Sequence, residues 1–113
     1  MATHEIPEPQ WAAFFDTFSE RRKDALVTVE TADPQKGPRK EESGLPLSAI
    51  TYITGGAVTV TFGGGATHVI NAPKTVYHKG AAGLLSDEVN HDEIIEITSA
   101  ENPPITQLHF ASR

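Results

Sequence analysis

The chain has 113 residues, which suits one domain, and it contains no cysteine, so disulfides and thiolate metal sites are excluded. Its formal net charge of -6 disfavours nucleic acid and anionic membranes as partners. No apolar run is long enough to cross a bilayer and the first residues do not resemble a signal peptide, so we expect one soluble cytoplasmic domain over residues 1–113.

The first predicted element is an amphipathic helix over residues 9–22. Its aromatic residues fall at positions i, i+3, i+4 and i+7, which share one face of a helix: Trp11, Phe14, Phe15 and Phe18. Pro9 suits the first turn, and basic residues at 21–23 complement the negative helix end. We expect the aromatic face to dock on a sheet, with a partner-binding or oligomer face as the alternative. Asp16 and Ser19 are expected on the surface.

A strand and a long loop are predicted next. Residues 25–32 alternate apolar and polar side chains, as a half-buried strand does. Residues 33–44 combine prolines and glycines with charges, so we expect a loop there. The basic residues at 21–23 and in this loop stand beside acids, which favours a solvated surface over the alternative of a phosphate-binding patch.

The middle of the chain predicts a β-meander whose glycine turns set the register. A three-residue turn at 54–56 places Tyr52 opposite Val58, and a bulge near residues 48–49 keeps the preceding leucines in phase.

The same reasoning extends the meander to two histidines. A turn at residues 64–66 pairs Phe62 with His68. A bend around Pro73, which cannot donate to a ladder, then pairs His68 with His78.

The chain continues with a second loop at 80–92 and two further strands at 93–99 and 105–110. The residues expected inward on these strands are Ile95, Ile97, Leu108 and Phe110. About six short strands and one helix predict a mainly β (α+β) fold. The N-terminal helix packs on a small, strongly twisted antiparallel sheet or barrel formed by residues 25–110.

The register makes a candidate ligand site of His68, His78 and Tyr52, which share the apolar side. Two imidazoles with a third ligand can hold zinc or a similar divalent ion, and His91 in the second loop supplies that third ligand. The spacing His-x9-His-x12-His matches no compact zinc motif. The competing interpretation is that the histidines cap the rim of the barrel, in which case no cofactor is expected.

No catalytic motif is present in the sequence. The glycine runs lack the lysine of a phosphate-binding loop, the acidic residues at 86–93 lack the order of a calcium loop, and no serine stands in a Gly-x-Ser-x-Gly elbow. Carboxylates occur only as sequence neighbours in loops, an arrangement that does not aim two of them at one substrate. We assign no catalytic residue and expect a non-enzymatic protein, with a metal-dependent enzyme using His91 as the alternative.

A resemblance to a known family covers residues 5–110. It rests on Glu5-Ile6-Pro7, Trp11-x-x-Phe14-Phe15-Asp16-x-Phe18-Ser19 and Leu26-Val27-Thr28-Val29-Glu30, with looser matches at Leu45-Pro46-Leu47-x-x-Ile50, His68-x-Ile70-x-x-Pro73-x-x-Val76 and Ile95-x-Ile97. In these motifs the chain resembles a bacterial family of small domains, the domain of unknown function 5335 type. That family carries no established activity or ligand, so the resemblance implies no site residues.

These observations favour an interaction or assembly module. Its expected partner is a second copy or another protein, bound through an exposed strand edge or leftover apolar surface. The alternative is a small-ligand or metal-binding protein that uses the pair His68 and His78.

Overall fold

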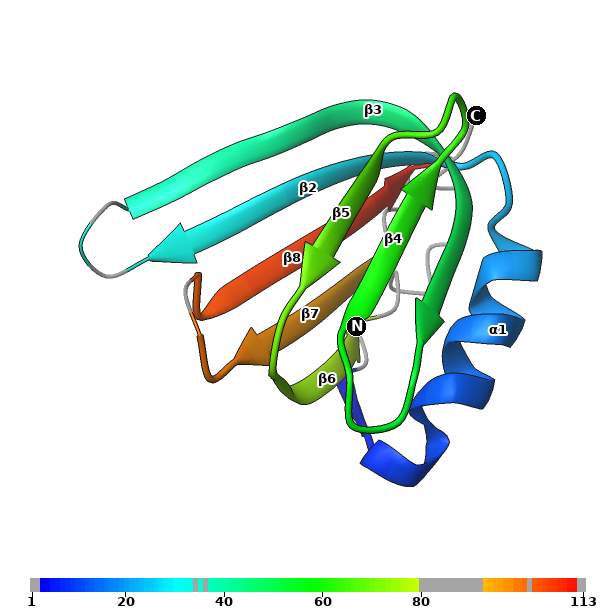
Figure 1. Ribbon diagram of the computed structural model, residues 1–113. Helices are drawn as coiled ribbons and strands as arrows, with labels where there is room; N and C mark the ends of the chain where they lie inside the picture. Colours follow the sequence, from blue (N-terminus) through cyan, green and yellow to red (C-terminus); the bar gives the residue numbers. More distant parts are fainter. Residues whose placement is uncertain (1–2, 34, 36, 80–92, 102, 112–113) are drawn as a thin grey trace.

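The structure is a computed structural model that describes residues 3–33, 35, 37–79, 93–101 and 103–111. One α-helix lies near the N-terminus and the remaining elements are almost all strands (Figure 1). In chain order they are β1 (Thr3–Ile6), the 3-10 turn η1 (Glu8–Gln10), α1 (Trp11–Arg21), β2 (Leu26–Asp33), β3 (Gly37–Tyr52), β4 (Val58–Phe62), β5 (Thr67–Ile70), β6 (Pro73–Lys79), β7 (Glu93–Ser99) and β8 (Ile105–Ala111). Within the described residues, no helix has the length and apolar character that a bilayer crossing requires.

The strands form one antiparallel sheet that folds back on itself. Its order is β1-β6-β7-β8-β2-β3-β4-β5, with β1 and β5 at the two edges. The first half of β3 pairs with β2 and the second half with β4, so β3 links two layers. In Figure 1, β4 and β5 lie in front of β7 and β8, while α1 lies along one side of the opening between the layers. The predicted fold class is confirmed, as an open twisted sheet of eight strands instead of about six.

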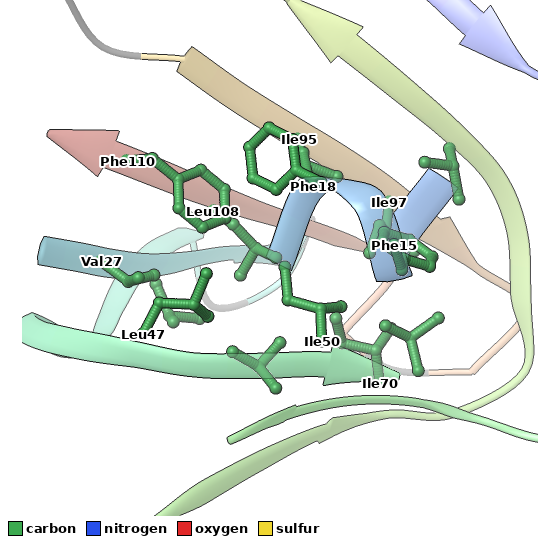
Figure 2. Packing of buried hydrophobic residues seen from close by; sticks show 14 of the residues in the cluster. Phe15, Phe18, Val27, Leu47, Ile50, Ile70, Ile95, Ile97, Leu108 and Phe110 are labelled. Atoms are coloured by element: carbon green, nitrogen blue, oxygen red, sulfur yellow. The ribbon is translucent and has the colours of Figure 1, made fainter. Parts of the chain in front are cut away.

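The aromatic face of α1 fills that opening. Trp11, Phe15 and Phe18 are buried, and Phe14 packs partly buried against the same cluster. Figure 2 shows Phe15 and Phe18 among apolar side chains of β7 and β8, the labelled ones being Ile95, Ile97, Leu108 and Phe110. The prediction that this helix face is core is confirmed, and the alternative of an exposed partner face is wrong.

The prediction that Ser19 lies on the surface is wrong. Its side chain is buried, and Oγ donates to the carbonyl of Phe15 at 2.6 Å while accepting the N–H of Ile50 at 2.8 Å. Ser19 thereby joins α1 to the backbone of β3. The sequence carried a signal for this position, because Ser19 lies eight residues after Trp11 and so falls on the same helix face.

We expect Ser19→Ala to lower the free energy of unfolding by about 1–2 kcal/mol, because the variant leaves the buried N–H of Ile50 without its acceptor. Urea unfolding measures this difference. Thr17→Ala, at an exposed position of the same helix, is the matched control and should change stability by no more than about 0.5 kcal/mol. Equal effects of the two substitutions would contradict a structural role for the Ser19 hydroxyl.

The predicted register of the first hairpin in the meander is confirmed. Tyr52 pairs with Val58 and Ile50 with Val60, and the ladder shifts between Leu47 and Ala49, where the bulge was expected.

The predicted register of the second hairpin is wrong by two residues. Its turn uses the glycines at 63–65, and Phe62 accordingly donates its N–H to the carbonyl of Ala66 at 2.9 Å. Gly64 and Gly65 have φ values of 96° and 99°, a region that glycine adopts without the strain a Cβ would cause. As a result His68 pairs with Val60 instead of Phe62.

The loop predicted at 33–44 is instead a continuation of two strands. β2 and β3 remain paired as far as Asp33 and Gly37, and residues 29–33 with 37–42 form a hairpin that we call the arm. Figure 1 shows the arm extending past β5. Pro38 is tolerated because this half of β3 has a neighbouring strand on one side only. The second predicted loop, 80–92, lies outside the described residues.

Candidate functional site

The structure does not bring the predicted site residues together. β5, which carries His68, pairs with β4, whereas β6, which carries His78, lies between β1 and β7. The predicted pairing of the two histidines is therefore wrong. The physical reason is that the chain crosses from one layer of the sheet to the other after β5 instead of turning back. His78 instead faces His4 of β1 and Ile95 of β7.

Tyr52 occupies a third place, beside the start of the helix. Its hydroxyl lies 3.2 Å from Glu8 Oε2 and accepts the N–H of Gly55 at 3.2 Å, while its ring stands edge-on to Trp11 with centroids 5.0 Å apart. These contacts anchor Tyr52 within the fold. The hollow next to it, of about 270 Å³, is lined by Glu8, Pro9, Ala12, Tyr52 and Thr54.

The metal prediction concerned His68, His78 and His91. His91 lies outside the described residues. Among the residues that are described, no three histidine, aspartate or glutamate side chains are grouped so as to hold a metal ion. Zinc binding stays a prediction, and the separation of the two described histidines removes its geometric basis.

Glu93, at the start of β7, gathers the cationic side chains at the end of α1. Arg21 donates from Nη1 and Nη2 to its two carboxylate oxygens, each at 3.0 Å, and Nε of Arg22 lies 3.1 Å from Oε1. His78 Nε2 is 2.9 Å from Oε2, and its ring stands edge-on to Phe14 and Phe18. The Glu93 side chain is only 15% exposed. We call these four polar residues, Glu93, Arg21, Arg22 and His78, the Glu93 cluster.

The Glu93 cluster sets the ionisation of its carboxyl. Burial on its own would raise the pKa of Glu93, but the hydrogen bonds of Arg21 and His78 and the charges of Arg21 and Arg22 outweigh burial and hold the pKa below its ordinary value. Both carboxylate oxygens are occupied, which leaves a poor general base and a poor metal ligand. The cluster therefore ties α1 to the sheet. Arg21 and Arg22 are therefore ion-paired to Glu93 of β7. The sequence had instead favoured a solvated surface for these basic residues.

A second polar grouping lies between β5 and the strands β2, β3 and β8. It surrounds a pocket of about 160 Å³ that we call the β5 pocket, lined by Thr31, Glu41, His68, Val69, Ile70, Asn71, Pro103 and Thr106. His68 is thus the one predicted ligand residue that lines it.

The β5 pocket has a polar floor and one carboxylate among its lining residues. Thr31 and Thr106 are buried, at 4% and 1% exposure, and Thr31 Oγ1 donates to Glu41 Oε2 at 3.1 Å. Arg39 approaches the same oxygen only to 4.0 Å and is 61% exposed, so it neutralises Glu41 weakly. Sequence reasoning had no signal that selects Glu41, because Glu41 falls in the segment 33–44 that we expected to be a loop.

The free edge of β5 borders this pocket. Paired residues of an antiparallel ladder alternate between bonded and non-bonded pairs. Since Phe62 and Ala66 form a bonded pair, the peptide groups of His68 and Ile70 face β4, and those of Thr67 and Val69 face the free edge. Val69 is 48% exposed and is one of few large apolar side chains that are exposed in the described chain.

Comparison with known proteins identifies the family of the chain but assigns no activity to it. The model of a family of unknown function (DUF5335) matches residues 2–104. An uncharacterized protein from Aquifex aeolicus (strain VF5) is 32% identical over 87 residues, which cover 76% of this chain and 78% of that relative. No solved structure matches the chain significantly.

Proposed function

The chain belongs to DUF5335, a family of unknown function, and from this premise we propose that it is a non-enzymatic interaction module that binds an extended segment of a partner protein along the free edge of β5. Such binding adds a strand to an existing sheet. Main-chain hydrogen bonds supply the affinity, and pockets for alternate side chains supply the specificity.

The observation that carries the proposal is that the edge strand β5 lacks the proline and the charged side chains that guard the other strand edges. Proteins commonly guard an exposed strand edge with proline, charged side chains or very short strands. The open edge of the arm follows this rule, since it carries Pro38, Arg39 and Lys40. The edge strands β1 and β5 are equally short, with four residues each, but β1 carries the charged side chain of Glu5. The sequence of β5 has no lysine, arginine, aspartate, glutamate or proline, and it exposes Val69.

The surroundings of β5 favour a single extended segment as the occupant over the edge of a second folded copy. The arm and the start of β8 extend past β5 in the layer behind it (Figure 1). A lone strand placed about 4.8 Å from β5 lies over this layer. Two copies paired antiparallel along β5 are related by a twofold axis normal to the sheet, so their second layers lie on the same side of the joined sheet and compete for the space over the new edge. Self-association, which the sequence also suggested, is therefore an outcome to be tested.

Other classes of function have weaker support. Small-molecule sites usually have volumes of roughly 300–1,000 Å³ and a mostly apolar lining. The hollow of about 390 Å³ between α1 and β3 is lined mainly by polar and charged residues such as Asp16, Glu20 and Lys23, and the β5 pocket has about 160 Å³. A pocket of that size suits one side chain of a bound segment. The Glu93 cluster, the densest group of ionisable side chains described, has its carboxylate oxygens occupied.

We expect Val69→Pro to weaken binding of an extended peptide by more than about tenfold, because it removes the N–H that faces the free edge. Proline at this position leaves the β4 ladder intact, since that N–H points away from β4. The probe is a capped eight-residue peptide of alternating threonine and valine, linked to a fluorophore, and the readout is fluorescence anisotropy.

Val69→Thr is the matched control, because it keeps both the N–H and a β-branched side chain; it should bind within about threefold of the wild type. Unfolding curves of both variants verify the fold. Equal weakening by the two substitutions, or no binding to the wild type, would overturn the proposal. A dimer that sedimentation detects in the wild type and that Val69→Pro abolishes would overturn the choice of occupant and assign the edge to a second copy.

A further inference from the structure

Resting on the proposed function, we infer that the β5 pocket selects a cationic side chain, lysine or arginine, in the segment that binds to β5. The inference concerns specificity, whereas the proposed function concerns the main-chain pairing along the edge.

The geometry of strand addition places a side chain at the pocket. Side chains directly opposite one another in a pair of strands lie on the same face of the sheet. His68 and Ile70 face inward on β5, since they pair with the buried residues Val60 and Val58. A residue of an added strand opposite His68 or Ile70 therefore also points inward. On that side the other wall of the pocket is formed by Thr31, Glu41 and Thr106 of the second layer of the sheet, and by Pro103 just before β8.

The charge of the pocket determines which side chain is accepted. Glu41 is the one carboxylate among the described lining residues, and none of those residues is a lysine or an arginine; Nε of Arg39 stays 4.0 Å from the Glu41 carboxylate. The net charge of the whole chain, -6, acts in the same direction.

Each type of inward side chain has a different consequence for Glu41. An apolar side chain would shield the carboxylate from water without supplying a counter-charge, which is unfavourable. An acidic side chain would add like-charge repulsion. A lysine or arginine would pair with Glu41 and could also donate to the hydroxyls of Thr31 and Thr106, while its aliphatic stem packs against Ile70 and Pro103.

The test compares three peptides that differ only at one central residue, which is lysine, norleucine or glutamate. Norleucine keeps the aliphatic stem of lysine and removes the ammonium group. We expect the lysine peptide to bind the wild type about tenfold more tightly than the norleucine peptide, and the glutamate peptide to bind most weakly. Glu41→Gln should reduce the preference for lysine to less than about twofold while leaving the norleucine affinity nearly unchanged.

Glu30→Gln is the matched control. It removes the same charge from the arm. Side chains alternate between the two faces of β2, so Glu30 points to the opposite face from its buried neighbour Thr31. On that face Glu30 lines a different hollow, together with Glu96 and Gln107. We expect Glu30→Gln to keep the preference for lysine. An equal loss in both variants would overturn the inference and assign the preference to the overall charge.

The remaining outcomes separate the inference from the proposed function. If all three peptides bind the wild type equally and Val69→Pro abolishes their binding, the inference is wrong and the proposed function stands. If none of the peptides binds, the proposed function is wrong, and the inference fails with it.

Discussion

Replacing Phe18 by alanine is expected to lower the free energy of unfolding by about 4 kcal/mol, which is the scale of a fully buried phenylalanine truncation. The side chain is 2% exposed and its ring meets that of Phe110 edge-on with centroids 4.8 Å apart. It also lies under the guanidinium of Arg21, at 4.9 Å, and beside His78. The substitution opens a cavity where α1, β6 and β8 meet, so calorimetry or urea unfolding should show a large loss.

Phe14→Ala provides the matched control for Phe18→Ala. Phe14 belongs to the same helix and the same aromatic face, but it is only partly buried. Its truncation should cost roughly half as much, because less apolar area returns to water. If Phe14→Ala destabilised the protein as much as Phe18→Ala, the packing of α1 described here would be wrong.

Glu93→Gln is expected to lower the free energy of unfolding by about 2 kcal/mol near neutral pH. The substitution keeps the shape of the side chain and removes the charge that faces two guanidinium groups. Arg21, whose side chain is 52% exposed, can return to water, whereas Arg22 is 17% exposed and loses its counter-charge in place. Urea unfolding of the two proteins measures the difference.

The pH dependence of that difference identifies its cause. The folded protein holds the pKa of Glu93 below the ordinary value of 4.5, so the unfolded chain takes up the proton first as the pH falls. The stabilisation by Glu93 is complete well above pH 4.5 and is lost as the pH falls through the lower pKa of the folded state. The gap between wild type and Glu93→Gln should therefore shrink in acid. A gap that stays constant from about pH 7 to about pH 3 would contradict an electrostatic role.

Glu96→Gln is the matched control on the same strand. The hydrogen bond from Lys79 likewise lowers the pKa of Glu96, but this carboxylate faces one lysine and one amide, that of Gln107, and no arginine. Its loss should cost less than about 1 kcal/mol. Equal effects at the two positions would show that the Glu93 cluster is an ordinary surface ion pair.

Periodicity and turn chemistry were sufficient for the helix and for the hairpin of β3 and β4. They failed at the next turn, where Gly63, Gly64, Gly65 and Ala66 offered more than one frame. Two positions of this turn have positive φ, and glycine occupies both. A turn at residues 64–66 would place Ala66 at the last of these positions, where a residue with a Cβ is disfavoured. The presence of Ala66 was therefore the signal that could have selected the turn at residues 63–65.

The crossing of the chain from one layer to the other, between β5 and β6, had no comparable signal in the sequence. Ala72, at the crossing, has φ 51° although it is not glycine, and its carbonyl accepts the N–H of Ala100 at 2.9 Å. This bond joins residues that are far apart in the sequence, and such contacts cannot be inferred from local patterns. Sequential pairing was the simplest assumption, and it placed β6 beside β5, whereas β6 has β1 and β7 as neighbours.

The candidate sites were hidden for the same reason. The partners of Glu93 come from α1 and β6, and Glu41 meets the residues of β5 only because β3 bends between the layers. The edge of β5 was foreseeable as a type of feature, since the sequence predicted an exposed strand edge. Which strand would carry it depended on the crossing after β5.

The central place of β2 in the sheet has a consequence for synthesis of the chain. β2 lies between β3 and β8, and its second ladder joins residues 26–32 to residues 105–111. On the ribosome, β2 can pair with β3 as soon as the two emerge, but its other side lacks a partner until β8 has been translated. During that interval the nascent hairpin has an unpaired strand edge, to which another chain can add a strand. We therefore expect this protein to need chaperones most while it is being translated.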